Sequence, residues 1–150
     1  MRTVDRIHIT APFDRVFDAA STVTRWPEIL PHYRWVRPLE DGLVEMAAWR
    51  PFGVFNYPTW WVSRMTVDRP AGEIRYVHVR GITAGMDVVW RLVEGGGASG
   101  VVDVEIVHTW NGPRWPLIGR VAADLVIGPV FIHGIASRTL AGIKRATEQA

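Results

Sequence analysis

The sequence contains no cysteine and a single lysine, Lys144, and none of its apolar runs is long enough to cross a membrane. The absence of cysteine excludes a disulfide framework, a thiolate nucleophile and a Cys-ligated metal site. No apolar signal core precedes the first predicted strand. We therefore expect a cytoplasmic protein that has no integral membrane segment.

The chain also has little excess of one charge over the other. Lysine and arginine together number 17 against 15 aspartate and glutamate residues, which gives a formal net charge of +2. The arginines are spread singly along the chain and form no basic run, so we expect no nucleic-acid partner. The length of 150 residues fits one domain, spanning residues 1–150.

Tryptophan, in contrast, is abundant. The chain has eight tryptophans, and many of its bulky aromatic residues fall in two short stretches, 26–35 and 52–61. A tryptophan side chain combines a large apolar area with one N–H that needs a partner, which suits the wall of a cavity that is apolar but not wholly dry. The composition therefore indicates a hollow domain that encloses an apolar molecule.

The hydrophobic pattern changes period twice along the chain. Residues 4–10 alternate like a strand, and two short helices are predicted from about 11 to 20 and from 25 to 30. Alternating strands are then predicted at 33–39, 43–50, 59–68, 73–80, 86–94 and 101–110. Apolar residues from 117 to 143 recur at helical spacing, with a kink expected at Gly128-Pro129.

The segments between these elements include several candidates for movement. The aromatic stretch 51–58 is predicted to be a loop, and residues 81–85 a glycine-containing bend. Together with the Gly128-Pro129 kink, these are the expected movable parts around a buried cavity. The glycine-rich stretch 95–100 is predicted to be a hairpin tip without a function of its own.

Several motifs resemble a known family. The stretch APF at 11–13 and WPEILPHY at 26–33 are similar to the opening of bacterial polyketide aromatase/cyclases. WVSR at 61–64 resembles their central strand, and GMDVVW at 85–90 resembles the strand after the bend. The chain is therefore identified as similar to the START/aromatase-cyclase superfamily, polyketide cyclase/dehydrase-like group. The resemblance implies an α+β helix-grip fold, in which a curved seven-stranded antiparallel sheet, with two short helices after its first strand, wraps around a long C-terminal helix.

The resemblance also implies site residues. It puts Trp26, Tyr33, Trp61, Ser63 and Trp90 on the cavity wall. The inward arginine that characterises the central strand of the family aligns with Met65, whereas Arg64 points to the opposite face of the strand. A thioether does not stabilise a developing oxyanion, so the ring-closing chemistry of the family lacks its arginine at this position.

Strand alternation adds further candidates. His78 shares a strand face with Ile74 and Tyr76, and His108 shares one with Ile106 and Trp110. A neutral histidine inside a cavity can act as a general base or acid, and Tyr33 can donate a proton to a carbonyl. Tyr33, His78 and His108 are thus the catalytic candidates. The complete expected ligand-binding set is Trp26, Leu30, Tyr33, Trp61, Ser63, Met65, His78, Met86, Trp90, His108 and Trp110.

The orientation of Arg50 is left open by the pattern. On the strand 43–50, Met46, Ala48 and Arg50 share one face, and Glu45, Ala47 and Trp49 share the other. Apolar content does not decide which face points inward. If Arg50 points inward, it supplies the arginine that Met65 does not.

Three functions remain open from the sequence. The leading one is the binding of a hydrophobic, aromatic or polyketide-like molecule, with cyclisation and dehydration of a poly-β-ketone if the protein is an enzyme. The alternatives are a non-catalytic carrier or sensor of a lipid or isoprenoid quinone, and an accessory protein whose cavity is filled by its own side chains. We expect no cofactor and no metal, since His78, His108 and His133 fall on different elements.

Overall fold

The computed structural model describes residues 1–52, 54–95, 100–112 and 132–149. The predicted helical stretch from 117 to 131, including the Gly128-Pro129 kink, lies outside these residues. The middle of the glycine-rich stretch 95–100 also lies outside them.

The described strands form one antiparallel sheet in the order β1-β7-β6-β5-β4-β3-β2. The first and last strands of this order, β1 and β2, are its edges. The strands are β1 (Arg2–Ile9), β2 (Tyr33–Pro38), β3 (Leu43–Phe52), β4 (Phe55–Asp68), β5 (Glu73–Gly81), β6 (Asp87–Glu94) and β7 (Val102–Thr109). β1 crosses over to pair with β7, and every other strand pairs with its neighbour in sequence.

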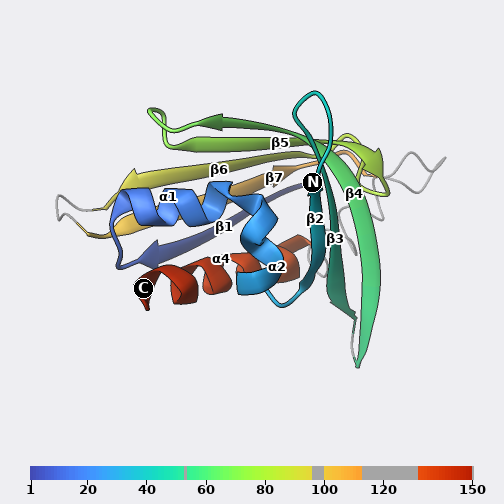
Figure 1. Cartoon of the computed structure of the whole chain (residues 1–150). Coiled ribbons are helices and arrows are strands. Elements are labelled where there is room, and N and C mark those ends of the chain that lie inside the picture. The colour runs from blue at the N-terminus through green and yellow to red at the C-terminus, as the bar shows by residue number, and fades with distance from the viewer. Residues whose placement is uncertain (53, 96–99, 113–131, 150) are drawn as a thin grey trace.

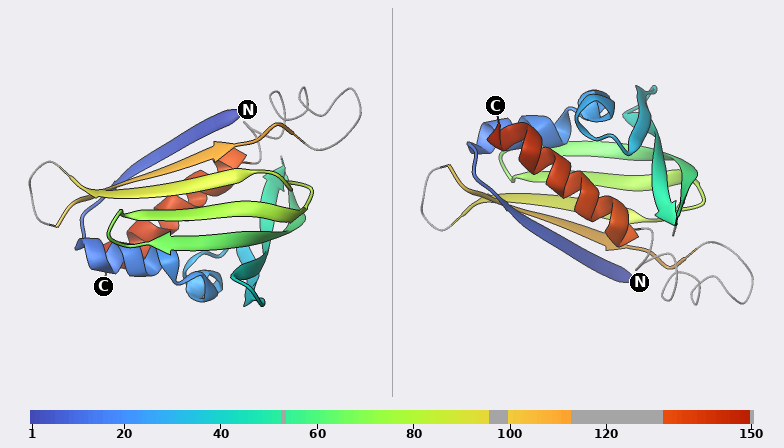
Figure 2. Two further views of the ribbon diagram at one scale, coloured as in Figure 1. Left: turned by 90° about the horizontal axis from the view of Figure 1, so that it is seen from above. Right: turned by 90° about the horizontal axis from the view of Figure 1, so that it is seen from below.

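The helices cover the concave face of this sheet. They are α1 (Phe13–Ser21), the short α2 (Trp26–Ile29), which follows the 3₁₀ turn η1 (Val23–Arg25), and α4 (His133–Glu148). Figure 1 shows the sheet curving around them, and Figure 2 shows α4 running obliquely across it. The predicted α+β helix-grip fold is confirmed.

The core lies between sheet and helices. Val16, Phe17 and Ala20 form the buried stripe of α1, at the 3–4 residue spacing that the sequence predicts. From α4, Leu140 and Ile143 are buried in the same hydrophobic core. None of the described helices is both long and apolar enough to span a membrane.

The prediction of a loop at 51–58 is wrong. β3 continues to Phe52, and β4 begins at Phe55, so the two strands form one long hairpin. Pro51 and Pro58 bound the predicted loop, and proline is unfavourable in a central strand. Pro58 pairs with Trp49 of β3, whereas the pairing of β4 with β5 begins only at Trp61, so Pro58 lies where β4 is an edge.

A register shift in β5 sets the direction of the site side chains. Trp61 and Val62 pair with Gly81 and Arg80, whereas Ser63 pairs with His78, so β5 holds one extra residue. Such a bulge increases the local twist and redirects the side chains beside it. Gly81 has a φ of +99°, and a Cβ atom there would lie 2.5 Å from the carbonyl oxygen of Trp60.

We predict that Gly81→Ala destabilises the protein by about 2 kcal/mol or more, because the substitution combines an unfavourable φ with a clash against backbone. Chemical denaturation measures this change. Gly134→Ala is the matched control, since a Cβ at Gly134 on α4 meets no atom of the described residues within 4 Å. Its stability should be unchanged or slightly higher. Equal losses in both variants would contradict the prediction.

Candidate functional site

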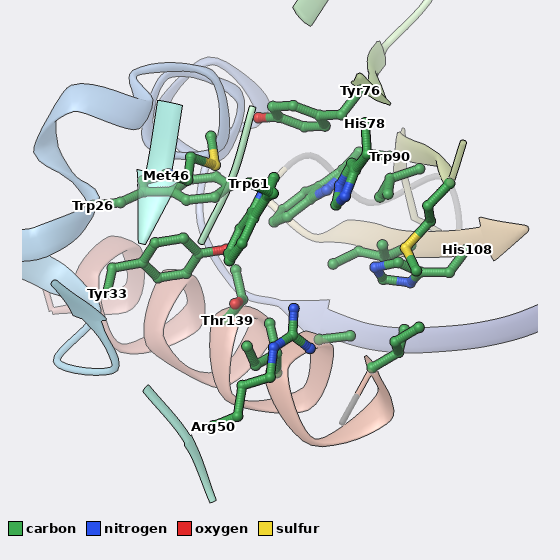
Figure 3. Close-up of a pocket in the computed structure, with 16 residues that line it drawn as sticks. Trp26, Tyr33, Met46, Arg50, Trp61, Tyr76, His78, Trp90, His108 and Thr139 are labelled. Carbon is green, nitrogen blue, oxygen red and sulfur yellow. The ribbon is translucent and has the colours of Figure 1, made fainter. Parts of the chain in front are cut away.

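A cavity with a volume of about 50 Å³ lies between the sheet and α4. Figure 3 shows side chains from β2 to β7, α2 and α4 pointing into it. The predicted residues that line it are Trp26, Tyr33, Trp61, His78, Met86, Trp90 and His108. The fold therefore brings most of the predicted ligand-binding residues together around one cavity.

The other predicted residues do not reach the cavity. Ser63 and Met65 lie on the predicted face of β4, but Met65 packs partly buried against the core, opposite Tyr76. Leu30 is fully buried against α4, where a Cβ at Gly142 would lie only 2.2 Å from its Cδ2 atom. The indole N–H of Trp110 donates to the carbonyl of Ala84 at 3.2 Å.

Arg50 points inward. Its side chain is 6% exposed and lines the cavity, whereas the neighbouring Trp49 is 37% exposed on the opposite face. The guanidinium carbon lies 5.5 Å from the centre of the Trp61 ring, in cation–π range. Its Nε donates to Thr59 Oγ1 at 3.0 Å, and Thr59 in turn donates to the backbone carbonyl of Ala48. An arginine therefore lies in the cavity wall, contributed by β3 rather than by the central strand.

The buried guanidinium sets the electrostatics of the site. Burial lowers the pKa of Arg50 to about 10, which still leaves it charged at neutral pH. Its charge in turn lowers the pKa of both cavity histidines. Burial, followed by the charge of Arg50, lowers the pKa of His108 to about 3, and burial, His108 and Arg50 lower the pKa of His78 to about 3.

These two histidines are therefore neutral and weakly basic at pH 7. His78 Nδ1 is hydrogen-bonded to Thr83 Oγ1 at 2.7 Å, and its ring stacks on Trp61 with 5.7 Å between centroids. His108 Nδ1 is buried and has no hydrogen-bond partner among the described residues. Burial beside a cation thus disfavours the imidazolium form of both histidines.

Tyr33 belongs to a polar chain that reaches α4. Its hydroxyl is hydrogen-bonded to Thr139, whose Oγ1 lies 2.9 Å from Nε2 of His32. Burial raises the pKa of Tyr33 to about 12, so the phenol is protonated and able to donate. Burial and the nearby arginines lower the pKa of His32 to about 4. This chain links β2 to the terminal helix at the edge of the cavity.

Sequence reasoning missed several lining residues. Tyr76 shares its strand face with His78, so alternation already indicated that it points inward. Met46 shares its face with Arg50, and the pattern left the direction of that face open. Thr139, Ile132, Ile135 and Ala136 come from the start and middle of α4, whose placement over the sheet no local pattern determines. Buried Tyr76 Oη also has no hydrogen-bond partner within the described part of the chain.

The aromatic rings pack against one another around the cavity. The ring of Trp26 lies 5.0 Å from that of Tyr33 and 5.7 Å from that of Trp90, and the ring of Tyr33 lies 6.1 Å from that of Trp61. The indole N–H of Trp26 donates to the carbonyl of Ala19. The polar atom of the indole thus has its partner outside the cavity, and the apolar ring makes the aromatic contacts. The space is consequently far below the roughly 300–1,000 Å³ of usual ligand pockets.

We predict that acid weakens the fold through the buried histidines. In the folded protein the pKa of His108 and of His78 is about 3, below the ordinary histidine value of 6.5. As pH falls from about 6.5 toward 4, the unfolded chain therefore takes up protons that the folded chain does not. Each histidine should lower the free energy of unfolding by about 1.4 kcal/mol per pH unit in this window.

Urea unfolding at several pH values measures the slope. His108→Gln should flatten it, because the variant lacks one of the two buried imidazoles. Identical slopes in the wild type and His108→Gln would contradict the prediction.

Solved structures match the fold over nearly the whole chain. The ZhuI aromatase/cyclase from a Streptomyces species is 16% identical with a TM-score of 0.74, covering 99% of this chain and 94% of that one. A START superfamily protein from Mycobacterium smegmatis is 12% identical with a TM-score of 0.70, covering 99% of this chain and 97% of that one. At these identities, the likeness concerns the fold.

The di-domain ARO/CYC BexL is 22% identical with a TM-score of 0.71, and the match covers 97% of this chain. This chain spans only 45% of that protein's length. No curated protein is similar enough to count as a match. The profile of the family described as "Polyketide cyclase / dehydrase and lipid transport" matches residues 9–126. The chain therefore belongs to the polyketide cyclase/dehydrase and lipid transport family.

Proposed function

We propose that the protein binds a small hydrophobic molecule that carries carbonyl or enol oxygens and holds those oxygens with Arg50. The observation that carries this proposal is the charged guanidinium of Arg50, buried in a cavity wall made mainly of aromatic rings. A cation in such low-polarity surroundings attracts an oxyanion far more strongly than it would in water. The aromatic rings suit a flat, unsaturated skeleton.

The polar groups of the cavity favour catalysis over simple carriage. A carrier of a lipid or quinone needs no acid or base, whereas here Tyr33, Tyr76, His78, His108 and Thr139 join Arg50 around one space. The aromatase/cyclase ZhuI and the ARO/CYC protein BexL have the same fold. We therefore extend the proposal to cyclisation with dehydration of a poly-β-ketone.

In this reaction a base removes a proton from the carbon between two carbonyls. His108 or His78 takes that proton, and Arg50 holds the enolate oxygen that results. The negative charge of the enolate offsets the charge of Arg50, which removes one cause of the low histidine pKa values. The enolate carbon attacks a second carbonyl, and the resulting alkoxide takes the proton back from the imidazolium to become a hydroxyl. The histidine then removes the remaining proton of the attacking carbon, Tyr33 protonates the hydroxyl so that it leaves as water, and the imidazolium returns its proton to the tyrosinate.

The small volume favours a second candidate function. A tri- or tetracyclic molecule does not fit in about 50 Å³, so binding requires the lining side chains to move. Met46 and Met86 are flexible enough to yield space, and the aromatic rings would have to separate. If they do not, the protein is an accessory protein with a residual cavity rather than a binding protein.

Native mass spectrometry of the purified protein separates these candidates. A co-purified hydrophobic compound, released on denaturation, is the result expected from the binding proposal. A protein mass without any adduct, together with no binding of aromatic 1,3-diketones, would leave the accessory role.

A naphthyl-substituted 1,3-diketone provides a direct test of Arg50. We expect Arg50→Met to weaken its binding by about tenfold to a hundredfold, because a hydrogen bond to a charged group contributes about 1.5–3 kcal/mol. Quenching of tryptophan fluorescence measures the affinity. Arg80→Met is the matched control, since Arg80 is exposed on β5. Unchanged affinity in Arg50→Met would refute the role given to the guanidinium.

A further inference from the structure

The distal part of the β3–β4 hairpin is a two-stranded ribbon with apolar side chains on both faces. The pairing of β2 with β3 ends at Ala48, and the pairing of β4 with β5 ends at Trp61. Beyond these points, in the described part of the chain, β3 and β4 form strand pairs only with each other, and the N–H of Trp49 still donates to the carbonyl of His32 at 2.7 Å. Figure 1 shows this ribbon curving away from the other strands, with its tip beyond α4.

The ribbon carries large exposed apolar side chains. Phe55 and Tyr57 lie on the concave face, where Tyr57 is directly opposite Arg50, and they are 72% and 61% exposed. Trp49 and Trp60 lie on the convex face and are 37% and 41% exposed. Val54, in the turn between the strands, is 93% exposed. A strand with one solvated face would alternate apolar with polar residues instead.

Within the ribbon the charges have one sign, because residues 46–67 contain no aspartate or glutamate. The exposed guanidinium of Arg34 lies over the Trp49 ring at 4.7 Å on the convex side. The guanidinium of Arg37 lies over the Trp35 ring at 4.3 Å on the same side, where Glu45 forms an ion pair with it at 3.8 Å. Arginine stacked on tryptophan presents positive charge next to an apolar surface.

From this arrangement we propose that the β3–β4 ribbon docks on the surface of a membrane that contains anionic lipids. A protein partner, including a second copy of this chain, would cover one face of the ribbon and leave the other exposed. The interfacial layer of a bilayer surrounds an inserted tip and covers both faces at once. Tryptophan and tyrosine favour this layer, and arginine attracts anionic headgroups.

The depth of insertion is limited by the backbone. The outer edges of a two-stranded ribbon present N–H and C=O groups that the hydrocarbon core cannot satisfy. The ribbon therefore lies at the boundary of headgroups and acyl chains, where water and headgroups accept these bonds. This inference does not depend on the proposed ligand or reaction, although docking would bring the cavity wall at Arg50 to the bilayer.

Vesicle flotation with the full chain tests the proposal. We expect the wild type to float with vesicles of phosphatidylcholine and phosphatidylglycerol, and more weakly with phosphatidylcholine alone. Phe55→Ser combined with Tyr57→Ser should reduce binding to the mixed vesicles by about tenfold or more. Circular dichroism should show an unchanged fold, because both residues are exposed.

Val67→Ser combined with Val93→Ser is the matched control. These residues are 51% and 62% exposed on other parts of the sheet, and their substitution should leave flotation unchanged. Absence of wild-type flotation, or equal flotation of the Phe55/Tyr57 variant, would overturn the proposal. Concentration-dependent dimerisation that the Phe55/Tyr57 variant abolishes, without vesicle binding, would assign the ribbon to a second copy of the chain and overturn it as well.

Discussion

The interior of this protein depends on how a guanidinium is kept charged among aromatic rings. Removing a cation from water is costly unless other groups replace its hydration. For Arg50, Thr59 accepts a hydrogen bond and the Trp61 ring faces the cation. Burial, assisted by the same charge, keeps His78 and His108 in their neutral forms. The protonation state of the cavity thus follows from the burial of both the histidines and Arg50.

The packing of the rings determines how much space surrounds that charge. The ring of Trp26 lies within attractive distance of the rings of Tyr33 and Trp90, so these contacts narrow the cavity. A bound molecule must replace these contacts with equivalent ones. Ligand affinity is therefore reduced by the free energy of separating the rings, and a flat aromatic ligand, which restores stacking, is the kind that compensates best.

Six of the eight tryptophans form two groups with different environments. Trp26, Trp61 and Trp90 line the cavity, whereas Trp35, Trp49 and Trp60 lie on the convex side of β2, β3 and β4. Ala47 lies between Trp35 and Trp60 in the sheet and is 1% exposed, which two large neighbouring rings explain. High tryptophan content thus reflects an internal site and an external surface, and composition alone does not separate them.

The sequence by itself determined the order of the elements, the antiparallel sheet and most of the inward faces, because strand and helix periods depend on local contacts. It left Arg50 undecided, since both faces of β3 carry apolar residues. Only the pairing of β3 between β2 and β4 decided that Arg50 points inward and Trp49 outward. Tertiary structure also decided the volume of the cavity. It decided as well that four predicted residues do not reach the cavity, namely Ser63, Met65, Leu30 and Trp110. Their positions follow from the curvature of the sheet and the placement of α4, which arise from contacts between residues far apart in the chain.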